Sequence, residues 1–426
     1  LLDLPTMSIR KASEGILGTH VTWEEFERNL TESLNTSARF GPNKSAVDIG
    51  EGIGFASRCA LVTCDWQGED AESLPRRVVL KMGSLIAIAA LADLLPPEQN
   101  LLKNAPEEMW ARLESNIKDM HNIECDTYDF MEQFDRGVAI PKRYYARAFN
   151  DENLLTGQIC MEYMEGAKMM NFHEKATLDQ MKQIARALGK LQAESTKYEV
   201  TSESIKTKDV FAEFTKSKPK EQYTMIFGPL KQFEASLTES VEKVEELMGD
   251  YYGATLPSTI HKQLGLMPVL VNGDLRTENI LVDSETGDLK ALIDWQCTHL
   301  GVGIEDLLRI SFFAQTTEER RATADVLIEE IYNSFVANLG SVPAPYSLKQ
   351  LKEVYDLLFP HCALFFSTGI ILLMKPHKPQ PGDDEEKQRR YEIVLDKARG
   401  VLEDVVTYHE KNKTSKQKVS WDYEAA

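Results

Sequence analysis

The chain has 426 residues, of which 42% are hydrophobic and 27% are charged, so we expect a folded protein of two units and not a disordered chain. Its 67 acidic and 48 basic residues give a formal net charge of −19. A surface this negative repels phosphate backbones and anionic lipids, which excludes a general nucleic-acid or membrane binder.

The first third of the chain has the pattern of a small sheet with one interposed helix. Thr22-Trp23-Glu24-Glu25 matches a capping box in front of an amphipathic helix. A second helix is predicted over 121–134. Short runs of β-branched and apolar residues predict strands over 46–49, 59–64, 77–82, 139–149 and 158–164.

After Gly166 helical patterns prevail. Thr177-Leu178-Asp179-Gln180 matches another capping box, and 206–250 is mostly helical with a turn near Gly228-Pro229. Short strands are predicted over 269–272, 280–282 and 289–293, and helices from Ile304 onward with a break at 375–384. We therefore predict an N-terminal α+β lobe over residues 1–163 and a larger, mostly helical lobe over residues 164–426.

The six cysteines are scattered from Cys59 to Cys362 without C-x-x-C spacing, which favours buried thiols over disulfides or a zinc site. The longest uncharged apolar stretch, Cys362 to Met374, is too short to span a bilayer. The first residues lack the basic flank and apolar core of a secretory signal. We predict a cytoplasmic protein, and no pattern indicates an obligate protein partner.

The most informative stretch for chemistry runs from Asn272-Gly273-Asp274 to Asn279 and is followed by Ile293-Asp294-Trp295. Asp274 follows an apolar strand, Asn279 comes five residues later, and Asp294 closes a third strand. Loops at one sheet edge therefore present two carboxylates and an amide. Carboxylate and amide oxygens suit Mg²⁺, and the second carboxylate can accept a proton from a hydroxyl. This layout is typical of phosphoryl transfer.

A glycine-rich segment precedes these residues. Gly50, Gly52 and Gly54 allow backbone amides to approach a phosphate closely because glycine has no Cβ, and Ser57 adds a hydroxyl; a plain hairpin turn is the alternative. Phe55 occupies the third glycine position of the dinucleotide fingerprint, and no strand–helix–strand crossover follows, so that fingerprint is absent.

The pattern D-x-x-x-x-N followed by I-D-W resembles the kinase-like phosphotransferases of small molecules, the group of the aminoglycoside phosphotransferases and choline kinase. The residues at 50–57 (GEGIGFAS), 121–124 (HNIE) and 294–301 (DWQCTHLG) resemble the choline-kinase-like, ecdysteroid kinase-like branch of nematodes and insects. The resemblance runs from about Ile49 to at least Arg309. It implies an α+β, bilobal protein-kinase-like fold.

The resemblance also implies roles for the matching residues. Asp274 matches the aspartate that accepts the proton of the substrate hydroxyl, and Asn279 and Asp294 match the metal ligands. Lys81 matches the lysine that reaches the α- and β-phosphates, with Glu124 as its ion-pair partner and Asp126 as the alternative.

Four further expectations concern the surroundings of these residues. The glycine-rich segment and Ser57 would cover the phosphates. The link Glu162-Tyr163-Met164 would offer its backbone to adenine. Asp306 resembles a structural acidic position. Asn272 stands where the family usually carries histidine, which predicts reduced activity and leaves a degenerate kinase open.

The predicted function is ATP- and Mg²⁺-dependent transfer of the γ-phosphate to a hydroxyl of a small molecule, which is steroid-like, choline-like or a xenobiotic alcohol. The alternative is a weak or inactive pseudokinase that binds nucleotide or acts as a scaffold. A protein kinase is disfavoured, because Trp295-Gln296 follows Asp294 in place of Phe-Gly and no A-P-E segment is present.

Overall fold

The computed structural model describes residues 8–50, 56–94, 105–135, 137–198, 220–251, 256–415 and 419–420. The chain divides into two compact units. The first, here called the sheet unit, comprises Leu1–Phe130 and Pro141–Glu165; the second, the helical unit, comprises Met131–Ile140 and Gly166–Ala426. Met131–Ile140 belongs to the helical unit because the carbonyl of Ala139 accepts the Leu292 N–H (2.8 Å).

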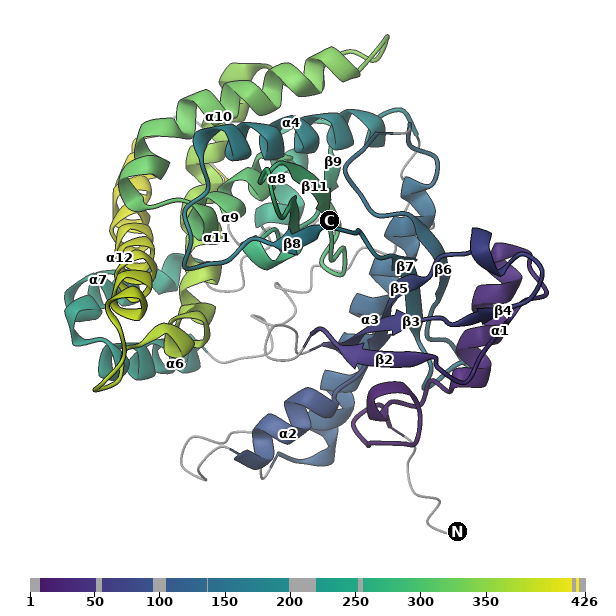
Figure 1. Ribbon diagram of the computed structural model, residues 1–426. Helices are drawn as coiled ribbons and strands as arrows, with labels where there is room; N and C mark the ends of the chain where they lie inside the picture. Colours follow the sequence, from purple (N-terminus) through teal and green to yellow (C-terminus); the bar gives the residue numbers. More distant parts are fainter. Residues whose placement is uncertain are drawn as a thin grey trace. The chain divides into compact units, whose positions relative to one another are not determined.

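A five-stranded antiparallel sheet in the order β2-β3-β5-β7-β6 is the centre of the sheet unit (Figure 1). In sheet order, the strands are β2 (Ser45–Asp48), β3 (Ser57–Thr63), β5 (Arg77–Gly83), β7 (Gln158–Glu162) and β6 (Arg143–Arg147). The predicted strands are confirmed, although the one expected over 139–149 is shorter. A separate antiparallel pair consists of β1 (Arg39–Phe40) and β4 (Trp66–Gln67).

The helices of this unit are α1 (Trp23–Leu34), α2 (Ile86–Leu94) and α3 (Glu107–Met131), with short 3₁₀ turns η1 (Ile16–Gly18) and η2 (Ala71–Ser73). The helix predicted over 121–134 is α3, which begins much earlier. Most of its first residues are exposed or half-buried, so the apolar pattern that predicts a helix begins only near Ile117.

The capping box predicted for α1 is only half formed. The Thr22 hydroxyl accepts the Glu25 N–H (3.1 Å), as expected. The Glu25 carboxylate accepts a hydrogen bond from the Gln158 amide of β7 (3.0 Å), so it ties the helix to the sheet.

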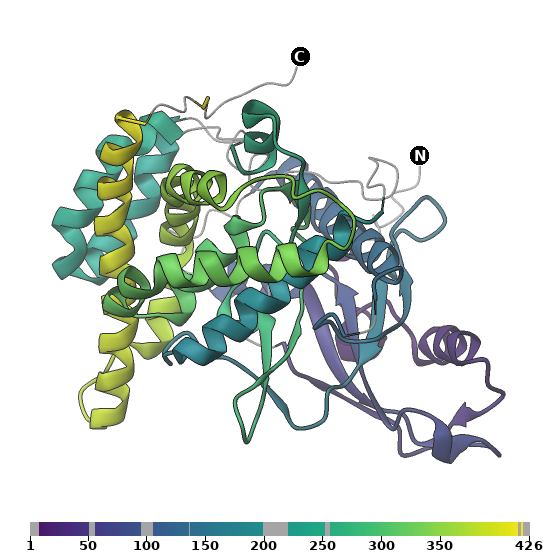
Figure 2. The same ribbon diagram turned by 90° about the horizontal axis from the view of Figure 1, so that it is seen from above.

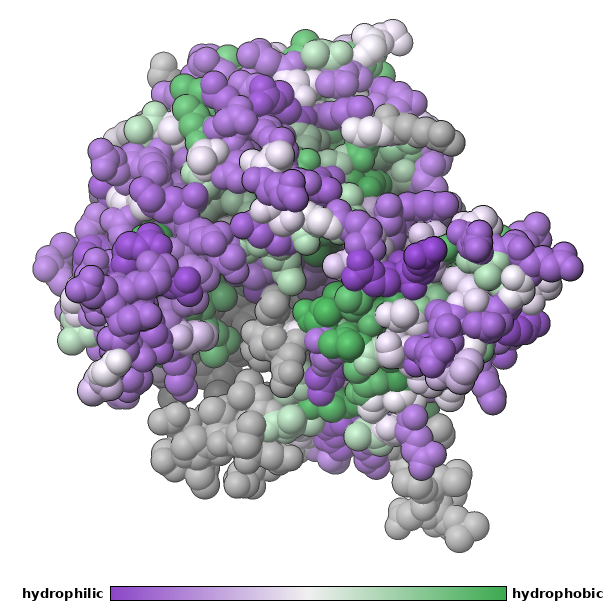
Figure 3. Space-filling view, viewed as in Figure 1, coloured by the Kyte–Doolittle hydropathy of each residue, from purple (hydrophilic) through white to green (hydrophobic). Residues whose placement is uncertain are grey.

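The two faces of the sheet differ in what covers them. One face packs on α1 through alternate residues of β3 and β5 and the apolar side of the helix: Ala60, Val62, Val78, Leu80, Met82, Phe26 and Leu30. The residues between them point to the opposite face. Lys81 is paired in register with Cys59 on one side and Ile159 on the other, so these three side chains share that face. Figure 3 shows a hydrophobic patch on the surface of this unit, with hydrophilic residues around it.

Two small sheets in the helical unit carry the loops of interest. One has the order β11-β10-β8 and the other pairs β12 with β9, all antiparallel. The strands are β8 (Ala167–Met169), β9 (Val269–Val271), β10 (Ile280–Asp283), β11 (Leu289–Leu292) and β12 (His299–Gly301), with the 3₁₀ turn η5 (Thr277–Asn279) just before β10.

Helices make up most of the remaining described part of this unit. They are α4 (Leu178–Ser195), α6 (Lys220–Phe233), α7 (Thr238–Tyr251), α8 (Leu256–Leu264), α9 (Ile304–Ala314), α10 (Thr317–Asn338), α11 (Leu348–Met374) and α12 (Glu385–Lys413), with 3₁₀ turns η4 (Ala235–Leu237) and η6 (Lys375–His377). The capping box at Thr177 and the break at 375–384 are confirmed.

Helices α4 and α10 lie side by side (Figure 2). Gly189 permits this approach, because a Cβ there would lie 2.5 Å from the Ile331 carbonyl oxygen. The turn predicted near Gly228-Pro229 is wrong, since α6 continues through Pro229 to Phe233. Proline removes a hydrogen bond, but Phe227 and Leu230 on either side are buried, and this packing keeps the helix intact.

The last helix is anchored by a buried lysine. Lys397 on α12 donates to the carbonyl oxygens of Phe172 (2.7 Å), Glu174 (2.6 Å) and Phe313 (2.7 Å). The three N–H donors of the ammonium thus have three acceptors, which offsets the cost of its burial. Desolvation lowers the pKa of Lys397 to about 7.

Among the described residues, no single helix combines the length and the apolar composition needed to cross a membrane; only the bent pair Leu348–Ser367 and Gly369–His377, taken together, meets both requirements.

Candidate active site

The sheet unit contains a buried ion pair between a strand and a helix. The Lys81 ammonium on β5 lies 2.5 Å from the Glu124 carboxylate on α3, and both side chains are almost fully buried. A buried pair of this kind is weak evidence for stability, because desolvation offsets the attraction. It does hold the lysine in one place on its face of the sheet, and Glu124 is the partner that the family resemblance favours over Asp126.

Two residues just before Glu124 tie α3 to the end of β6 and to the segment that follows it. The Asn122 amide donates to the Phe149 carbonyl (2.9 Å) and accepts the Phe149 N–H (2.8 Å). A ring nitrogen of His121 lies 3.0 Å from the Arg147 carbonyl oxygen. Burial lowers the pKa of His121 to about 4, with the charge of Lys81 acting in the same direction. These contacts set the position of α3 and therefore of Glu124.

The glycine-rich segment is only partly described. Gly50 follows β2, and its N–H donates to the Asp48 carboxylate (2.9 Å). Ser57 opens β3, with its hydroxyl 3.7 Å from the Cys59 sulfur. Gly52 and Gly54 lie outside the described residues. The structure thus places the two ends of this segment beside each other at one edge of the sheet.

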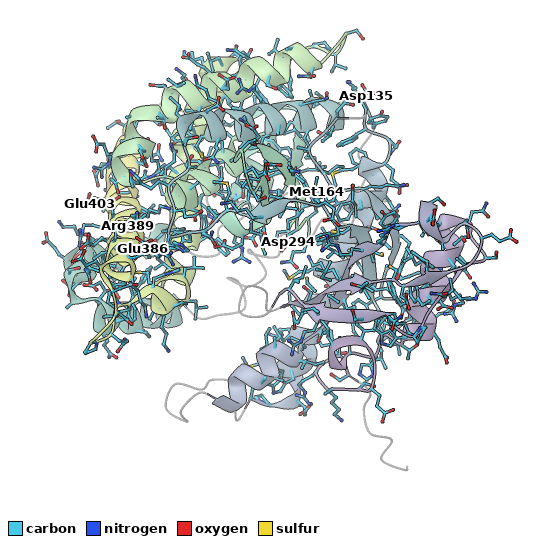
Figure 4. All side chains as sticks on the ribbon, in the orientation of Figure 1. Asp135, Met164, Asp294, Glu386, Arg389 and Glu403 are labelled. Carbon is cyan, nitrogen blue, oxygen red and sulfur yellow. The ribbon has the colours of Figure 1, made fainter. Side chains whose placement is uncertain are left out.

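The segment after β7 ends the sheet unit. Glu162 is the last residue of β7, and its N–H donates to the Lys142 carbonyl (2.8 Å). The Arg77 guanidinium lies over the Tyr163 ring, 4.6 Å from its centroid. Met164 follows, in the stretch between β7 and β8 that Figure 4 shows. This short segment connects the sheet unit to the helical unit at Glu165.

In the helical unit, residues of the loop between β9 and β10 alternate between buried and partly exposed positions. Leu275, Thr277 and Asn279 are buried, whereas Asp274, Arg276 and Glu278 between them are partly exposed. The Asn279 amide donates to the Asp274 carbonyl (2.8 Å), and the Asn279 N–H donates to the Arg276 carbonyl (2.9 Å). The loop is therefore closed on itself, with Asp274 and Asn279 at its two ends.

Asp294 follows β11 and has a left-handed backbone conformation (φ 63°). Aspartate tolerates this region better than most residues. The neighbouring Ile293 N–H donates to the Asn279 carbonyl (3.0 Å), which brings the end of β11 to the end of the Asp274–Asn279 loop. Figure 4 labels Asp294 at this position.

Asn272 joins the two loops. This fully buried residue donates its amide hydrogen to the Asp294 carbonyl (2.9 Å) and accepts the Asp274 N–H (3.1 Å). The Asp306 carboxylate accepts the N–H groups of Asn272 (2.9 Å) and Gly273 (3.0 Å), which is the scaffold role expected for it. The asparagine in place of histidine thus bridges Asp274 and Asp294, and it supplies one donor and one acceptor.

We expect Asn272→Asp to loosen this bridge. The change keeps the shape and the acceptor but places a carboxylate oxygen against the Asp294 carbonyl oxygen. Losing a buried hydrogen bond in this way should lower the free energy of unfolding by about 1–3 kcal/mol. Urea denaturation measures the change. Asn338→Asp on α10 is the matched control, since that amide also donates to a backbone carbonyl, that of Ser334 (2.7 Å). Equal effects of both changes would contradict the bridge.

A buried charge network lies directly beside the loops. The Glu305 carboxylate accepts from Arg309 (2.7 and 2.8 Å) and lies 3.0 Å from a ring nitrogen of His299. The network also borders Gly273 (φ 82°), where a Cβ would lie 2.4 Å from the Cys297 carbonyl oxygen and 3.0 Å from the His299 ring. Glycine is therefore required at this position.

Burial and neighbouring charges shift the carboxyl groups in opposite directions. Desolvation raises the pKa of Asp274 to about 6; Arg276 opposes this shift and Asp294 adds to it. Desolvation also raises the pKa of Asp306 to about 6, against its two backbone hydrogen bonds. For Glu305, burial alone would raise the pKa, but His299 and Arg309 outweigh it and hold the pKa at about 2.

The residues at the loop ends fit a magnesium ion. No group of three or more His, Cys, Asp or Glu side chains in the described part of the chain is arranged to hold a metal by itself. Mg²⁺ usually takes only one or two protein carboxylates and completes its shell with waters and substrate phosphates. The amide nitrogen of Asn279 is engaged with Asp274, so its amide oxygen is the atom that can face a cation. Asp294 adds a carboxylate.

The structure thus brings the predicted residues together in two groups, each within its own unit. Lys81 and Glu124 meet in the sheet unit, and Asp274, Asn279 and Asp294 meet in the helical unit. Cys59, Leu61 and Val79 share the face of Lys81, and alternation along two strands is the sequence signal that reveals them.

Glu305 is a further residue of the site, and its i,i+4 spacing to Arg309 is visible in the sequence. The contact of Glu305 with His299 was not visible, because it depends on how β12 and α9 pack.

The chain is similar to several known proteins. An uncharacterised kinase-like protein of Caenorhabditis elegans is 23% identical over 300 residues, which are 68% of this chain and 78% of the relative. Among solved structures, a microcompartment-associated aminopropanol kinase has 15% identity and a TM-score of 0.46, with 88% of this chain and 95% of that chain covered. The choline kinase of Cryptosporidium parvum has 11% identity and a TM-score of 0.46, with 86% and 92% covered.

The kinase-like relative confirms the predicted resemblance to choline-kinase-like small-molecule kinases, and the described sheets and helices form the α+β fold expected, in two units. The family described as "Uncharacterized oxidoreductase dhs-27" (DUF1679) matches residues 9–413, so nearly the whole chain is covered. The chain belongs to the DUF1679 family.

Proposed function

We propose that the protein is an ATP- and Mg²⁺-dependent phosphotransferase that transfers the γ-phosphate to a hydroxyl of a small molecule. One observation supports this above all: a single set of hydrogen bonds centred on Asn272 holds Asp274, Asn279 and Asp294 at adjoining loop ends. Oxygen ligands for a hard cation and a carboxylate that accepts a proton are what phosphoryl transfer needs from a protein.

In this proposal each group has one task. Asp274 orients the acceptor hydroxyl and takes its proton. The oxygens of Asn279 and Asp294 hold Mg²⁺, which neutralises charge on the phosphates when bound. Lys81, held by Glu124, binds the non-transferred phosphates, and the backbone at Glu162-Tyr163-Met164 binds adenine. Gly50, Gly52, Gly54 and Ser57 cover the phosphates.

The word oxidoreductase in the family description has no support in the described fold. Dinucleotide-binding domains are built on a parallel sheet with helical crossovers, whereas the strand pairs in the described sheets are antiparallel. The alternative is a pseudokinase, which experiment must distinguish from an active kinase. The two hydrogen bonds of Asn272 favour a catalytically competent loop over a degenerate one. The acceptor alcohol and the cytoplasmic location stay predictions.

Thermal unfolding with and without MgATP tests the proposal. Ligand at 100 times its Kd should stabilise the wild type by about 2.7 kcal/mol. Asp294→Asn keeps the shape of the side chain, but it should weaken the response to MgATP because a charged metal ligand is lost. Asp288→Asn, at an exposed residue next to β11, is the control. A wild type that does not respond to MgATP removes both the kinase and the nucleotide-binding pseudokinase; a response without transfer to any alcohol favours the pseudokinase.

Cysteine labelling provides an independent test of nucleotide binding at the sheet. Cys59 is half-buried and shares the face of Lys81, whereas the other five cysteines are buried. We expect an alkylating reagent to modify one thiol per native chain, and MgATP to slow this reaction about tenfold by covering the face. Mass spectrometry identifies the site, and Cys59→Ser removes the reactive thiol. An unchanged labelling rate would place the nucleotide elsewhere.

A further inference from the structure

The partly exposed side of the Asp274–Asn279 loop carries a cation as well as carboxylates. Leu275 and Thr277 are fully buried, so the alternating residues Asp274, Arg276 and Glu278 lie on the other side of the loop. Arg276 precedes η5, and its carbonyl accepts the Asn279 N–H (2.9 Å). The backbone that positions Asn279 therefore also positions Arg276.

Arg276 lies close to the proposed proton acceptor. Its Nε is 4.0 Å from Oδ2 of Asp274, and each side chain retains 21% of its surface exposed. At 4.0 Å these two atoms attract each other but are too far apart for a hydrogen bond. The guanidinium thus stands beside the carboxylate, with part of its surface open to a ligand.

The negative charges around the loop favour a cation at this place. The carboxylates of Asp274, Glu278 and Asp294 all act electrostatically on Arg276. An anionic phosphoryl group that approaches Asp274 meets this negative charge, and like charges a few ångströms apart repel strongly where water is excluded. A guanidinium at this place opposes the repulsion, and its planar set of donors matches two phosphoryl oxygens at once.

We propose that Arg276 is a further catalytic residue, which binds the phosphoryl group during its transfer. This rests on the proposed function. The acceptor oxygen forms a bond to the γ-phosphorus, and the bond from that phosphorus to the bridging oxygen of ATP breaks, its electron pair leaving with ADP. The hydroxyl proton goes to the Asp274 carboxylate. Arg276 donates to non-bridging oxygens of the moving group and so holds it beside Asp274.

The test uses a mimic of the moving group, so that no acceptor need be known. MgADP with aluminium fluoride places a planar fluoride complex where the transferred phosphoryl group would lie. In the wild type this mixture should raise the unfolding temperature above that with MgADP alone. In Arg276→Gln the shift with MgADP should remain and the additional shift should disappear. Arg276→Lys, which keeps the charge without the planar donors, should recover part of it.

Kinetics provides the second readout. Kinases hydrolyse ATP slowly when water takes the place of the alcohol. For this reaction the kcat of Arg276→Gln should be about 10²–10³-fold lower than that of the wild type, and its KM for ATP should lie within about threefold of the wild-type value. The control is Arg186→Gln on α4, which removes the same charge from a surface pair with Glu330 (3.0 Å). It should match the wild type in both measurements.

The outcomes separate the two proposals. A wild type that responds neither to MgATP nor to MgADP defeats the proposed function, and this inference with it. If MgADP stabilises the wild type but aluminium fluoride adds nothing, or adds as much in Arg276→Gln as in the wild type, only the role of Arg276 is overturned. Loss of the MgADP shift in Arg276→Gln also overturns it, because the arginine would then serve nucleotide binding or folding and not the moving group.

Discussion

Replacing Asp274 with asparagine is expected to lower transfer, and ATP hydrolysis, by about 10²–10⁴-fold, the usual contribution of a general base. The amide has nearly the same shape as the carboxylate but cannot accept the hydroxyl proton. The loop should stay intact, since Asp274 holds it through its backbone: its N–H donates to Asn272 and its carbonyl accepts from Asn279. Steady-state kinetics measures the effect.

The response to MgATP is the internal control for this variant. It should remain close to that of the wild type, because nucleotide binding depends on other residues. Asp288→Asn, at an exposed position bonded to Gln183 (2.8 Å), tests the substitution itself and should leave the rate unchanged. Full activity of Asp274→Asn would show that another group takes the proton, and a lost response to MgATP would show that Asp274 serves binding.

The second large effect is expected for Glu305→Gln. The wild-type carboxylate is fully buried and balances Arg309, whose side chain is only 4% exposed. Without it a buried guanidinium has lost its counter-charge, which costs about 3–5 kcal/mol. Chemical denaturation measures the loss. The matched control is Glu403→Gln on α12 (Figure 4), where the Arg321 partner at 3.0 Å is exposed, so the change should cost less than about 1 kcal/mol.

The pH dependence of the Glu305 variant checks the cause. In the folded protein the pKa of Glu305 lies at about 2, below its ordinary value of 4.5. A carboxyl with a depressed pKa adds stability that is complete above the ordinary value and is lost as the pH falls through the folded value. The difference between wild type and Glu305→Gln should therefore be full at pH 7 and shrink between about pH 4.5 and 2. A constant difference would point to packing and not to charge.

Local signals in the sequence were sufficient to predict many of the helices and strands. The capping box at Thr177 predicts α4, and the spacing from Asp274 to Asn279 and Asp294 predicts that their loops adjoin. The single sheet expected there is wrong, since β9 pairs with β12 whereas β10 and β11 belong to another sheet. The sequence-based prediction of helices failed where tertiary packing overrides local helix signals. Pro229 stays inside α6, and the exposed start of α3 has no apolar periodicity to reveal it.

Contacts between distant residues needed either a family resemblance or the structure itself. Lys81 and Glu124 are 43 residues apart, and only the resemblance paired them. Nothing in the local sequence showed that Asn122 ties α3 to Phe149, or that His299 meets Glu305, because each contact depends on how a helix packs against a strand or its flanking loop. The two hydrogen bonds of Asn272 were not visible in the sequence either, since they depend on the position of Asp294, and the reduced activity expected from this asparagine stays a prediction.

The anchoring of Lys397 has a consequence for how the chain is made. Its ammonium satisfies carbonyl groups of residues 172, 174 and 313, which leave the ribosome long before it does. Arg320 likewise forms its ion pair with Asp404 (2.6 Å) only after α12 has been synthesised. The sheet unit, by contrast, is complete once residue 165 has been synthesised. Because domains fold from the N-terminal end during translation, the sheet unit is complete while the helical unit still lacks α12, and the acceptors of Lys397 stay without it until α12 emerges.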